Sequence, residues 1–121
     1  MGTLMTMKAL CIRQPFASLI ASGTLITETR TWKTNYRGPL LIVASKSGAV
    51  PGLPAGQAIA IGNLSDCRNI TEPDAQTAYC VKNPEAFAWI FLDIQPIQPF
   101  PVRGRLGLFD VQLPELIDSA R

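Results

Sequence analysis

The sequence contains no histidine. This absence excludes Ser-His-Asp triads, Cys-His dyads and HExxH zinc sites, because each of them requires an imidazole as base or ligand. The three cysteines (Cys11, Cys67 and Cys80) are widely spaced and form no CxxC pair. We therefore expect small buried thiols rather than a disulfide scaffold or a structural zinc site, and we predict neither a metal nor a cofactor.

Long hydrophobic runs and glycine-rich phosphate loops are also missing. Lys8 and Arg13 interrupt the apolar N-terminal stretch, and no run approaches the roughly 20 apolar residues of a membrane span. No GxGxxG or P-loop pattern occurs, which argues against nucleotide-cofactor enzymes of those types. No signal peptide is visible, so we expect a cytoplasmic protein that contacts no membrane.

The 121 residues are enough for one domain with a single core. We expect a flexible N-terminal extension over residues 1–6 and a single domain over residues 7–121. No internal repeat or interdomain linker interrupts the second range.

Charge is distributed unevenly along the chain. Residues 1–60 hold six bases and one acid, Glu28, whereas residues 61–121 hold five bases and eight acids. A basic half indicates an anionic partner. The alternative is that the two halves attract each other within the fold, and charge alone does not decide between them.

Short apolar or alternating segments are separated by turn-forming residues. They predict strands at 8–12, 25–33, 40–45, 57–64, 89–94 and 106–111, helices at 14–23 and 71–81, and helical turns at 84–88 and 114–120. Gly62 is typical of a bulge, and Pro96, Pro99 and Pro101 require an edge or a connector. The pattern predicts a mainly β (α+β) fold, a small barrel of five to seven strands flanked by two or three short helices.

The densest polar cluster lies between Arg13 and Lys46. Glu28 and Arg30 are two residues apart on a predicted strand, so their side chains share a face. Arginine binds phosphate or carboxylate, and aromatic rings stack on bases. The predicted ligand-binding residues are Arg13, Gln14, Glu28, Arg30, Trp32, Tyr36, Arg37 and Lys46. The alternative, a structural Glu28–Arg30 ion pair with Trp32 in the core, stays open.

Two further motifs have weaker interpretations. Arg68 next to Cys67 would lower the pKa of that thiol if the two side chains met, although an exposed turn explains the pair as well. Arg103-Gly104-Arg105 either contacts a phosphate backbone or protects a strand edge.

Several of these segments together resemble the ASCH domain family. The resemblance is carried by the run from Lys8 to Ile20, by Gly23, Glu28, Arg30 and Trp32, by Tyr36 to Ile42, and by Trp89, Pro99, Pro101 to Gly104 and Gly107 to Phe109. It covers most of residues 7–112. It implies a PUA-like β-barrel with a cleft beside the first helix, and RNA binding.

One position departs from the family's hallmark run, Gly-x-Lys-x-x-Glu-x-Arg. Here the run extends from Gly23 to Arg30, and Leu25 replaces the lysine, while Glu28 and Arg30 match. An enzymatic branch of the family hydrolyses N4-acetylcytidine and relies on that lysine. Val43 is a second departure, since many relatives have histidine there.

We therefore expect an RNA- or nucleotide-binding module rather than an enzyme. The alternative is a small amidohydrolase for a modified nucleoside such as N4-acetylcytidine, with Glu28 as catalytic base and Lys33 or Lys46 supplying the amine. A third possibility is a protein-interaction domain without a small ligand.

Overall fold

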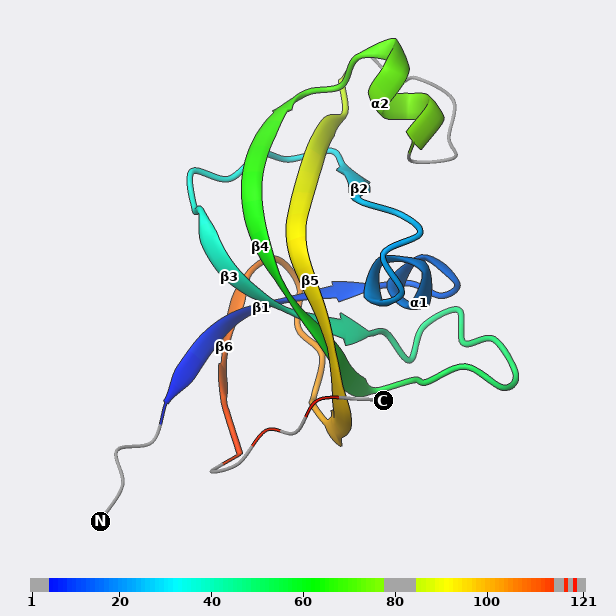
Figure 1. Ribbon diagram of the computed structural model, residues 1–121, viewed down its shortest axis with the longest axis vertical. Coiled ribbons are helices and arrows are strands. Elements are labelled where there is room, and N and C mark those ends of the chain that lie inside the picture. Colours follow the sequence, from blue (N-terminus) through cyan, green and yellow to red (C-terminus); the bar gives the residue numbers. More distant parts are fainter. Residues whose placement is uncertain (1–4, 78–84, 115–116, 118, 120–121) are drawn as a thin grey trace.

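The computed structural model of the protein describes residues 5–77, 85–114, 117 and 119. These residues form six strands and two short helices (Figure 1). In chain order they are β1 (Thr6–Ile12), α1 (Phe16–Ala21), β2 (Thr27–Arg30), β3 (Gly38–Ala44), β4 (Gln57–Asn69), α2 (Glu72–Thr77), β5 (Phe87–Pro101) and β6 (Phe109–Gln112).

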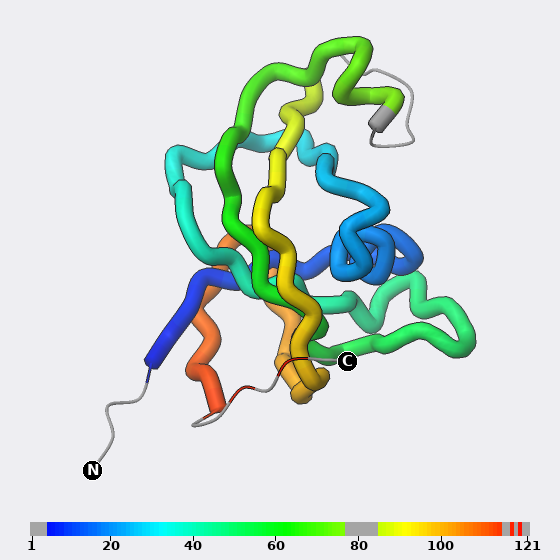
Figure 2. Tube along the Cα trace, in the orientation of Figure 1, coloured from blue at the N-terminus to red at the C-terminus, as the bar shows by residue number. Residues whose placement is uncertain are grey.

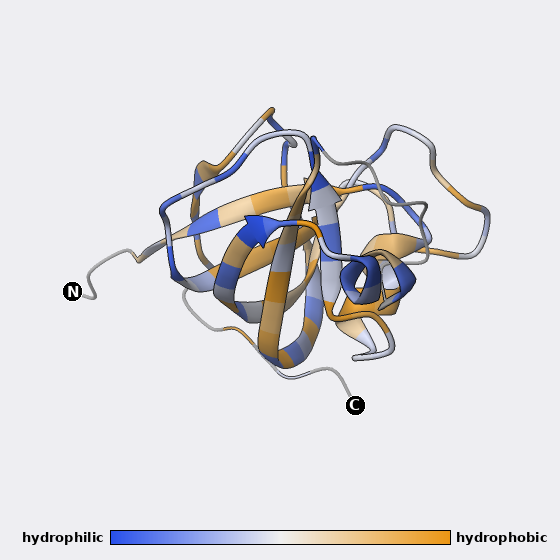
Figure 3. Ribbon diagram, turned by 90° about the horizontal axis from the view of Figure 1, so that it is seen from above, coloured by the Kyte–Doolittle hydropathy of each residue, from blue (hydrophilic) through white to orange (hydrophobic). Residues whose placement is uncertain are grey.

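The strands form one sheet in the order β2-β5-β4-β3-β1-β6. Strands β1 and β3 are parallel, and the other neighbours are antiparallel. Seen from above, the sheet curls around its interior (Figure 3), and α1 lies beside the sheet in Figure 1. The described edge strands, β2 and β6, do not pair with each other, so the curl is not closed by hydrogen bonds. The mainly β fold with five to seven strands and two short helices is confirmed.

The continuous apolar run of β3 reflects burial on both faces. Leu40 and Ile42 point into one core cluster, which contains Trp89, while Leu41 and Val43 point into a second. Because successive strand residues face opposite sides, a strand between two clusters has no polar face. The sheet is thus packed on both sides along β3.

Strands β4 and β5 are longer than predicted because irregular positions bend them without ending them. The β4–β5 register shifts between Ile61 and Asn63, as expected for a bulge at Gly62. A Cβ at Gly62 would lie 2.4 Å from Ile94 Cδ1. The predicted bulge at Gly62 is therefore confirmed. The prediction for Pro96, Pro99 and Pro101 is also confirmed: the described part of β2 pairs only with residues 87–90 of β5, so the three prolines lie beyond that ladder.

Other boundaries differ from the sequence-based ones. Strand β2 is shorter than predicted because Leu25 is buried and its amide donates to Leu19 O of α1. Phe87 belongs to β5 rather than to a turn over 84–88, and residues 106–108 precede β6.

The start of β1 and the second helix can also be compared with the predicted boundaries. Thr6 already pairs with Gln112, so β1 begins inside the range 1–6 expected to be an extension. Thr71 caps α2 as predicted, since Asp74 N donates to Thr71 Oγ1. Residues 78–81 of the predicted helix, and most of the predicted turn at 114–120, lie outside the described residues. Among the described residues, no helix has the length and apolar character needed to cross a membrane.

Candidate functional site

Two adjoining cavities lie where the parallel strands β1 and β3 end side by side. The last pair in register is Ile12 with Ala44, and Ser45 N then donates to Ile12 O at 2.9 Å. The cavities measure about 390 and 730 Å³, within the range of small-ligand sites. They share four lining residues, namely Cys11, Ser45, Arg105 and Leu106.

The smaller space, here called the Glu28 cavity, is built from α1, β1, β2 and the connection between β5 and β6. Its remaining lining residues are Leu10, Arg13, Phe16, Glu28, Thr29, Arg30 and Gly107. It combines an aromatic ring, a carboxylate and arginine side chains, which are the groups that recognise nucleotides.

Glu28 and Arg30 share a face of β2, as the alternation predicted. Glu28 Oε2 lies 3.5 Å from Arg30 Nη2, and Glu28 Oε1 accepts a hydrogen bond from Thr29 N at 2.9 Å. Burial raises the pKa of Glu28, and the Arg30 charge and these hydrogen bonds oppose that rise. The carboxyl is therefore a partly desolvated hydrogen-bond acceptor held in a fixed orientation.

Arg30 also fixes the floor of the site. Its Nη2 donates to Cys11 O, which joins β2 to the end of β1. In the described part of the chain, its buried Nε has no hydrogen-bond partner. The Glu28–Arg30 ion pair is thus partly structural, as the alternative interpretation held, and it also lines the cavity.

Arg13 lies at the mouth of the Glu28 cavity, against the loop after β3. A Cβ at Gly48 would lie 2.4 Å from Arg13 Nη2, and Gly48 has a φ of +70°. Glycine is therefore required here for conformation and for space. The exposed guanidinium rests on the Gly48 backbone and remains accessible from solvent.

The larger space, here called the Lys46 cavity, is lined mainly by the ends of β3 and β5. Lys46, Arg103 and Arg105 line it, together with small residues such as Ser47 and Gly56. The Lys46 stem lies on Gly56, where a Cβ would be 2.5 Å from Lys46 Cε. Among the residues that the structure describes, five basic side chains and a single acidic one, Glu28, line the two cavities.

Residues 103–107, here called the strap, lie on the connection between β5 and β6 (Figure 2, orange). Two of them, Arg105 and Leu106, line both cavities. Val102 N donates to Gly56 O at 3.1 Å just before the strap. A Cβ at Gly104 would lie 2.8 Å from Cys11 Sγ. The strap therefore lies directly against the end of β1.

Cys11 is held in its thiol form. Burial raises its pKa, and the Arg105 amide and the Arg30 charge oppose that rise only in part. A thiolate nucleophile is consequently disfavoured at neutral pH. Cys11 and Cys67 are both free and half-buried, while Cys80 lies outside the described residues.

Half of the predicted ligand-binding residues line the cavities. Arg13, Glu28 and Arg30 meet in the Glu28 cavity, and Lys46 lines the adjoining one. The sequence prediction did not include Cys11, Ser45, Arg103, Arg105 and Leu106 in this set. The Arg103-Gly104-Arg105 motif was the available signal, but its position beside β1 depends on tertiary pairing.

The structure places the other four predicted residues elsewhere. Gln14 is buried, where its Nε2 donates to Pro54 O at 2.9 Å and its Oε1 accepts from Ser18 N at 3.0 Å. Trp32 packs edge-on against Trp89 with ring centroids 4.7 Å apart. Their side chains fasten a loop and complete the core, so neither lines a cavity.

Tyr36 and Arg37 are likewise directed at the protein's own backbone. Tyr36 Oη donates to Pro39 O, and Arg37 Nη1 donates to Thr34 O and Tyr36 O. These bonds fold the connection between β2 and β3, and they turn both side chains away from the two cavities.

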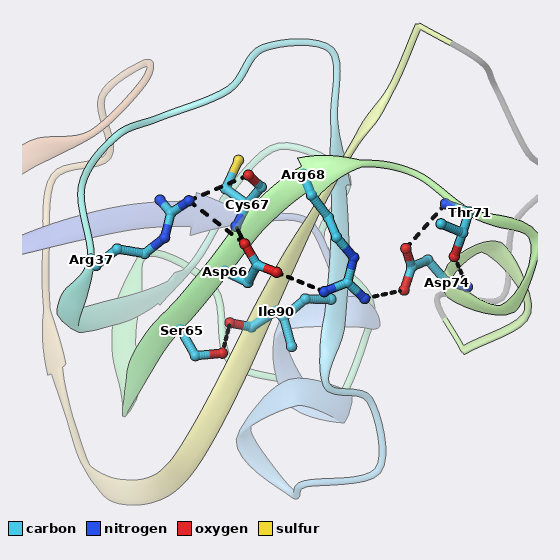
Figure 4. Close-up of polar contacts among 8 residues, drawn as sticks. All are labelled: Arg37, Ser65, Asp66, Cys67, Arg68, Thr71, Asp74 and Ile90. Carbon is cyan, nitrogen blue, oxygen red and sulfur yellow. Dashed lines mark hydrogen bonds and ion pairs between the residues drawn. The ribbon is translucent and has the colours of Figure 1, made fainter.

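A second polar cluster joins β4 to α2 (Figure 4). Arg68 binds Asp66 at 2.7 Å and Asp74 at 2.9 Å, and Arg37 Nη2 donates to Cys67 O. The hydrogen bond from Arg68 holds the pKa of Asp66 below its usual value. Arg68 is thus engaged with carboxylates rather than with the Cys67 thiol, and both residues lie in β4 rather than in the exposed turn that was the other interpretation.

The groups needed for the alternative chemistry are not brought together. Leu25, which replaces the family lysine, is buried in the core. Of the described lysines, none lines the Glu28 cavity. The described residues contain no cluster of three or more Cys, Asp or Glu side chains that would hold a metal ion.

Solved structures with a similar fold include three crystal structures of the ASCH protein from Zymomonas mobilis. The unmutated protein and a tyrosine-to-phenylalanine variant each give a TM-score of 0.59 at 17% identity, and a serine-to-alanine variant gives 0.66 at 16%. Each comparison covers 89% of this chain and 87% to 90% of the other. At this identity they establish the fold alone.

No curated protein matches the sequence significantly. The ASCH domain model, in contrast, matches residues 10–101. That range begins within β1, extends to the end of β5 and includes Glu28, Arg30 and Lys46. The chain belongs to the ASCH domain family.

Proposed function

We propose that this protein binds single-stranded RNA through the two cavities at the ends of β1 and β3. ASCH domains are broadly associated with RNA binding, and the lining of these cavities supports that role here. The observation that carries the proposal is the concentration of five basic side chains around one partly buried carboxylate. Basic side chains supply affinity for phosphate, and a carboxylate accepts hydrogen bonds from the amino group of a base.

Each side chain has a distinct part in this proposal. Arg13 and Arg105 bind phosphate at the two rims of the Glu28 cavity, and Phe16 offers a ring face to the base. Glu28 accepts from the base edge, and Arg30 holds its carboxylate in position. An unstacked base is required, because only a base outside a helix presents its pairing edge to a pocket.

The test is a matched comparison of two substitutions. Arg105→Gln removes a basic residue shared by both cavities, and Lys33→Gln removes an exposed lysine that lines neither. With a short single-stranded RNA at low salt, we expect Arg105→Gln to weaken binding about fivefold to tenfold and Lys33→Gln to leave it within about twofold, since only the former removes a phosphate contact. Equal losses in the two variants, or no binding by the unaltered protein, would contradict the proposal.

Amide hydrolysis of a modified nucleoside is the alternative function for this site, and it requires a separate assay. Glu28 has the raised pKa that a general base uses, but the described lysines do not accompany it in the cavity. Turnover of N4-acetylcytidine that disappears in Glu28→Gln would assign the site to catalysis instead. We expect no turnover.

A further inference from the structure

An apolar side chain stands fully in solvent between the two cavities. Leu106 is 98% exposed and lines both of them. The other exposed large hydrophobic side chains of the described residues are between 37% and 66% exposed. Leu106 therefore contributes nothing to the core, although it sits at the centre of the basic site.

The backbone on both sides of Leu106 is held in place. Val102 is buried before the strap and Phe109 is buried after it. Within the strap, the Gly104 backbone packs against Cys11, since a Cβ at Gly104 would lie 2.8 Å from Cys11 Sγ. Gly107 follows with a φ of +69°, a left-handed conformation that turns the chain directly after Leu106. The strap thus presents Leu106 at its apex from a fixed base.

The two cavities beside Leu106 suit different parts of two consecutive nucleotides. On one side the Glu28 cavity offers Phe16 and a carboxylate, which suit a base. On the other side the Lys46 cavity offers Lys46 and Arg103, which suit phosphate. Arg105, adjacent to Leu106, borders both spaces and is placed to meet the phosphate that links two nucleotides.

We propose that Leu106 is a wedge that separates two consecutive nucleotides of a bound RNA strand. This inference rests on the proposed function. One base enters the Glu28 cavity, the linking phosphate meets Arg105, and the next nucleotide occupies the Lys46 cavity. An apolar side chain inserted at a base step replaces the lost stacking contact, as in proteins that unstack bases with leucine or phenylalanine. The ligand class is therefore an oligonucleotide of at least two residues rather than a free nucleoside.

The experiment compares Leu106→Ala with Leu92→Ala. Leu92 is 49% exposed and lines neither cavity, so it is a matched surface leucine. The probes are adenosine monophosphate and a trinucleotide RNA containing 2-aminopurine, whose fluorescence rises when it leaves a stack. In the unaltered protein we expect tighter binding of the trinucleotide than of the monophosphate, together with a fluorescence increase.

In Leu106→Ala we expect trinucleotide affinity to fall about tenfold, the size of a lost leucine contact, and the fluorescence increase to disappear. Monophosphate binding falls by a smaller factor than trinucleotide binding, because only the trinucleotide extends to both sides of Leu106. Leu92→Ala behaves like the unaltered protein. RNA binding with equal affinity and fluorescence in Leu106→Ala would overturn the wedge while leaving the proposed function intact. Absence of any RNA binding by the unaltered protein would overturn both.

Discussion

The proposed RNA binding should depend on salt, because basic side chains line the two cavities. Of the five lining bases, Arg30 is paired with Glu28. The other four, Arg13, Lys46, Arg103 and Arg105, have no ion pair among the described residues. Four phosphate contacts on a single strand predict a slope of about −2.8 for log affinity against log salt concentration. Binding should therefore weaken about 50-fold between about 50 and 200 mM salt.

Removing two of these bases gives a quantitative control. The double variant Arg103→Gln/Arg105→Gln retains two free bases, so the slope should fall to about −1.4 and the loss over the same range to about sevenfold. Lys33→Gln lies outside both cavities and should leave the slope unchanged. The assay is fluorescence anisotropy with a labelled single-stranded RNA at four or more salt concentrations. A slope near zero, or one that the double variant does not change, would refute the assignment of these bases to phosphate.

Three further predictions concern the stability of the protein. Burial raises the pKa of Glu28, so the folded state binds more protons than the unfolded state at pH values between the ordinary glutamate pKa of 4.5 and the raised one. The stability of the protein should therefore fall as pH rises through that range. Denaturation of Glu28→Gln at several pH values should show a gain in the free energy of unfolding over the unaltered protein that grows with pH. A gain that stays constant with pH would contradict a raised pKa of Glu28 in the folded state. Arg68→Ala should cost about 1 kcal/mol at pH 7, because it removes a partner of Asp74. That cost should vanish in an acid denaturation series as Asp66 and Asp74, the two carboxylates that Arg68 binds, become protonated below their lowered pKa values. An equal cost at low pH would exclude both ion pairs. Gln14→Ala should lower the free energy of unfolding by about 1–3 kcal/mol in urea, since it leaves Pro54 O without its donor, and a neutral effect would argue against this bond as a fastener.

Local patterns were sufficient to predict the fold class and the central part of the site. Two-residue alternation placed Glu28 and Arg30 on one face of β2, and the 3.5 Å ion pair confirms it. The apolar run over residues 40–45 predicted a strand, which the structure buries over residues 40–44. Gly62 and the prolines predicted where the sheet bends and where β5 lacks a second partner. These features depend on neighbouring residues, which a sequence displays directly.

The other half of the site depends on contacts between distant segments. Gly104 packs against Cys11, and Arg105 lines both cavities, because β6 pairs with β1 and draws the strap across the end of that strand. Arg37 and Trp32 have the chemistry of ligand-binding residues, but backbone carbonyls bind the first and Trp89 packs against the second. Residue type alone does not distinguish an arginine that binds its own loop from one that faces a cavity.

The central claim is that RNA occupies the two cavities on either side of the strap. Backbone amide chemical shifts, recorded by NMR during titration with a trinucleotide RNA, test it most directly. We expect the largest chemical-shift changes at Ser45, Thr29 and the strap, residues 103–107. We expect none in α2, whose residues line neither cavity. Changes centred on α2 or on the second polar cluster around Arg68, with the strap unaffected, would contradict RNA binding in these cavities.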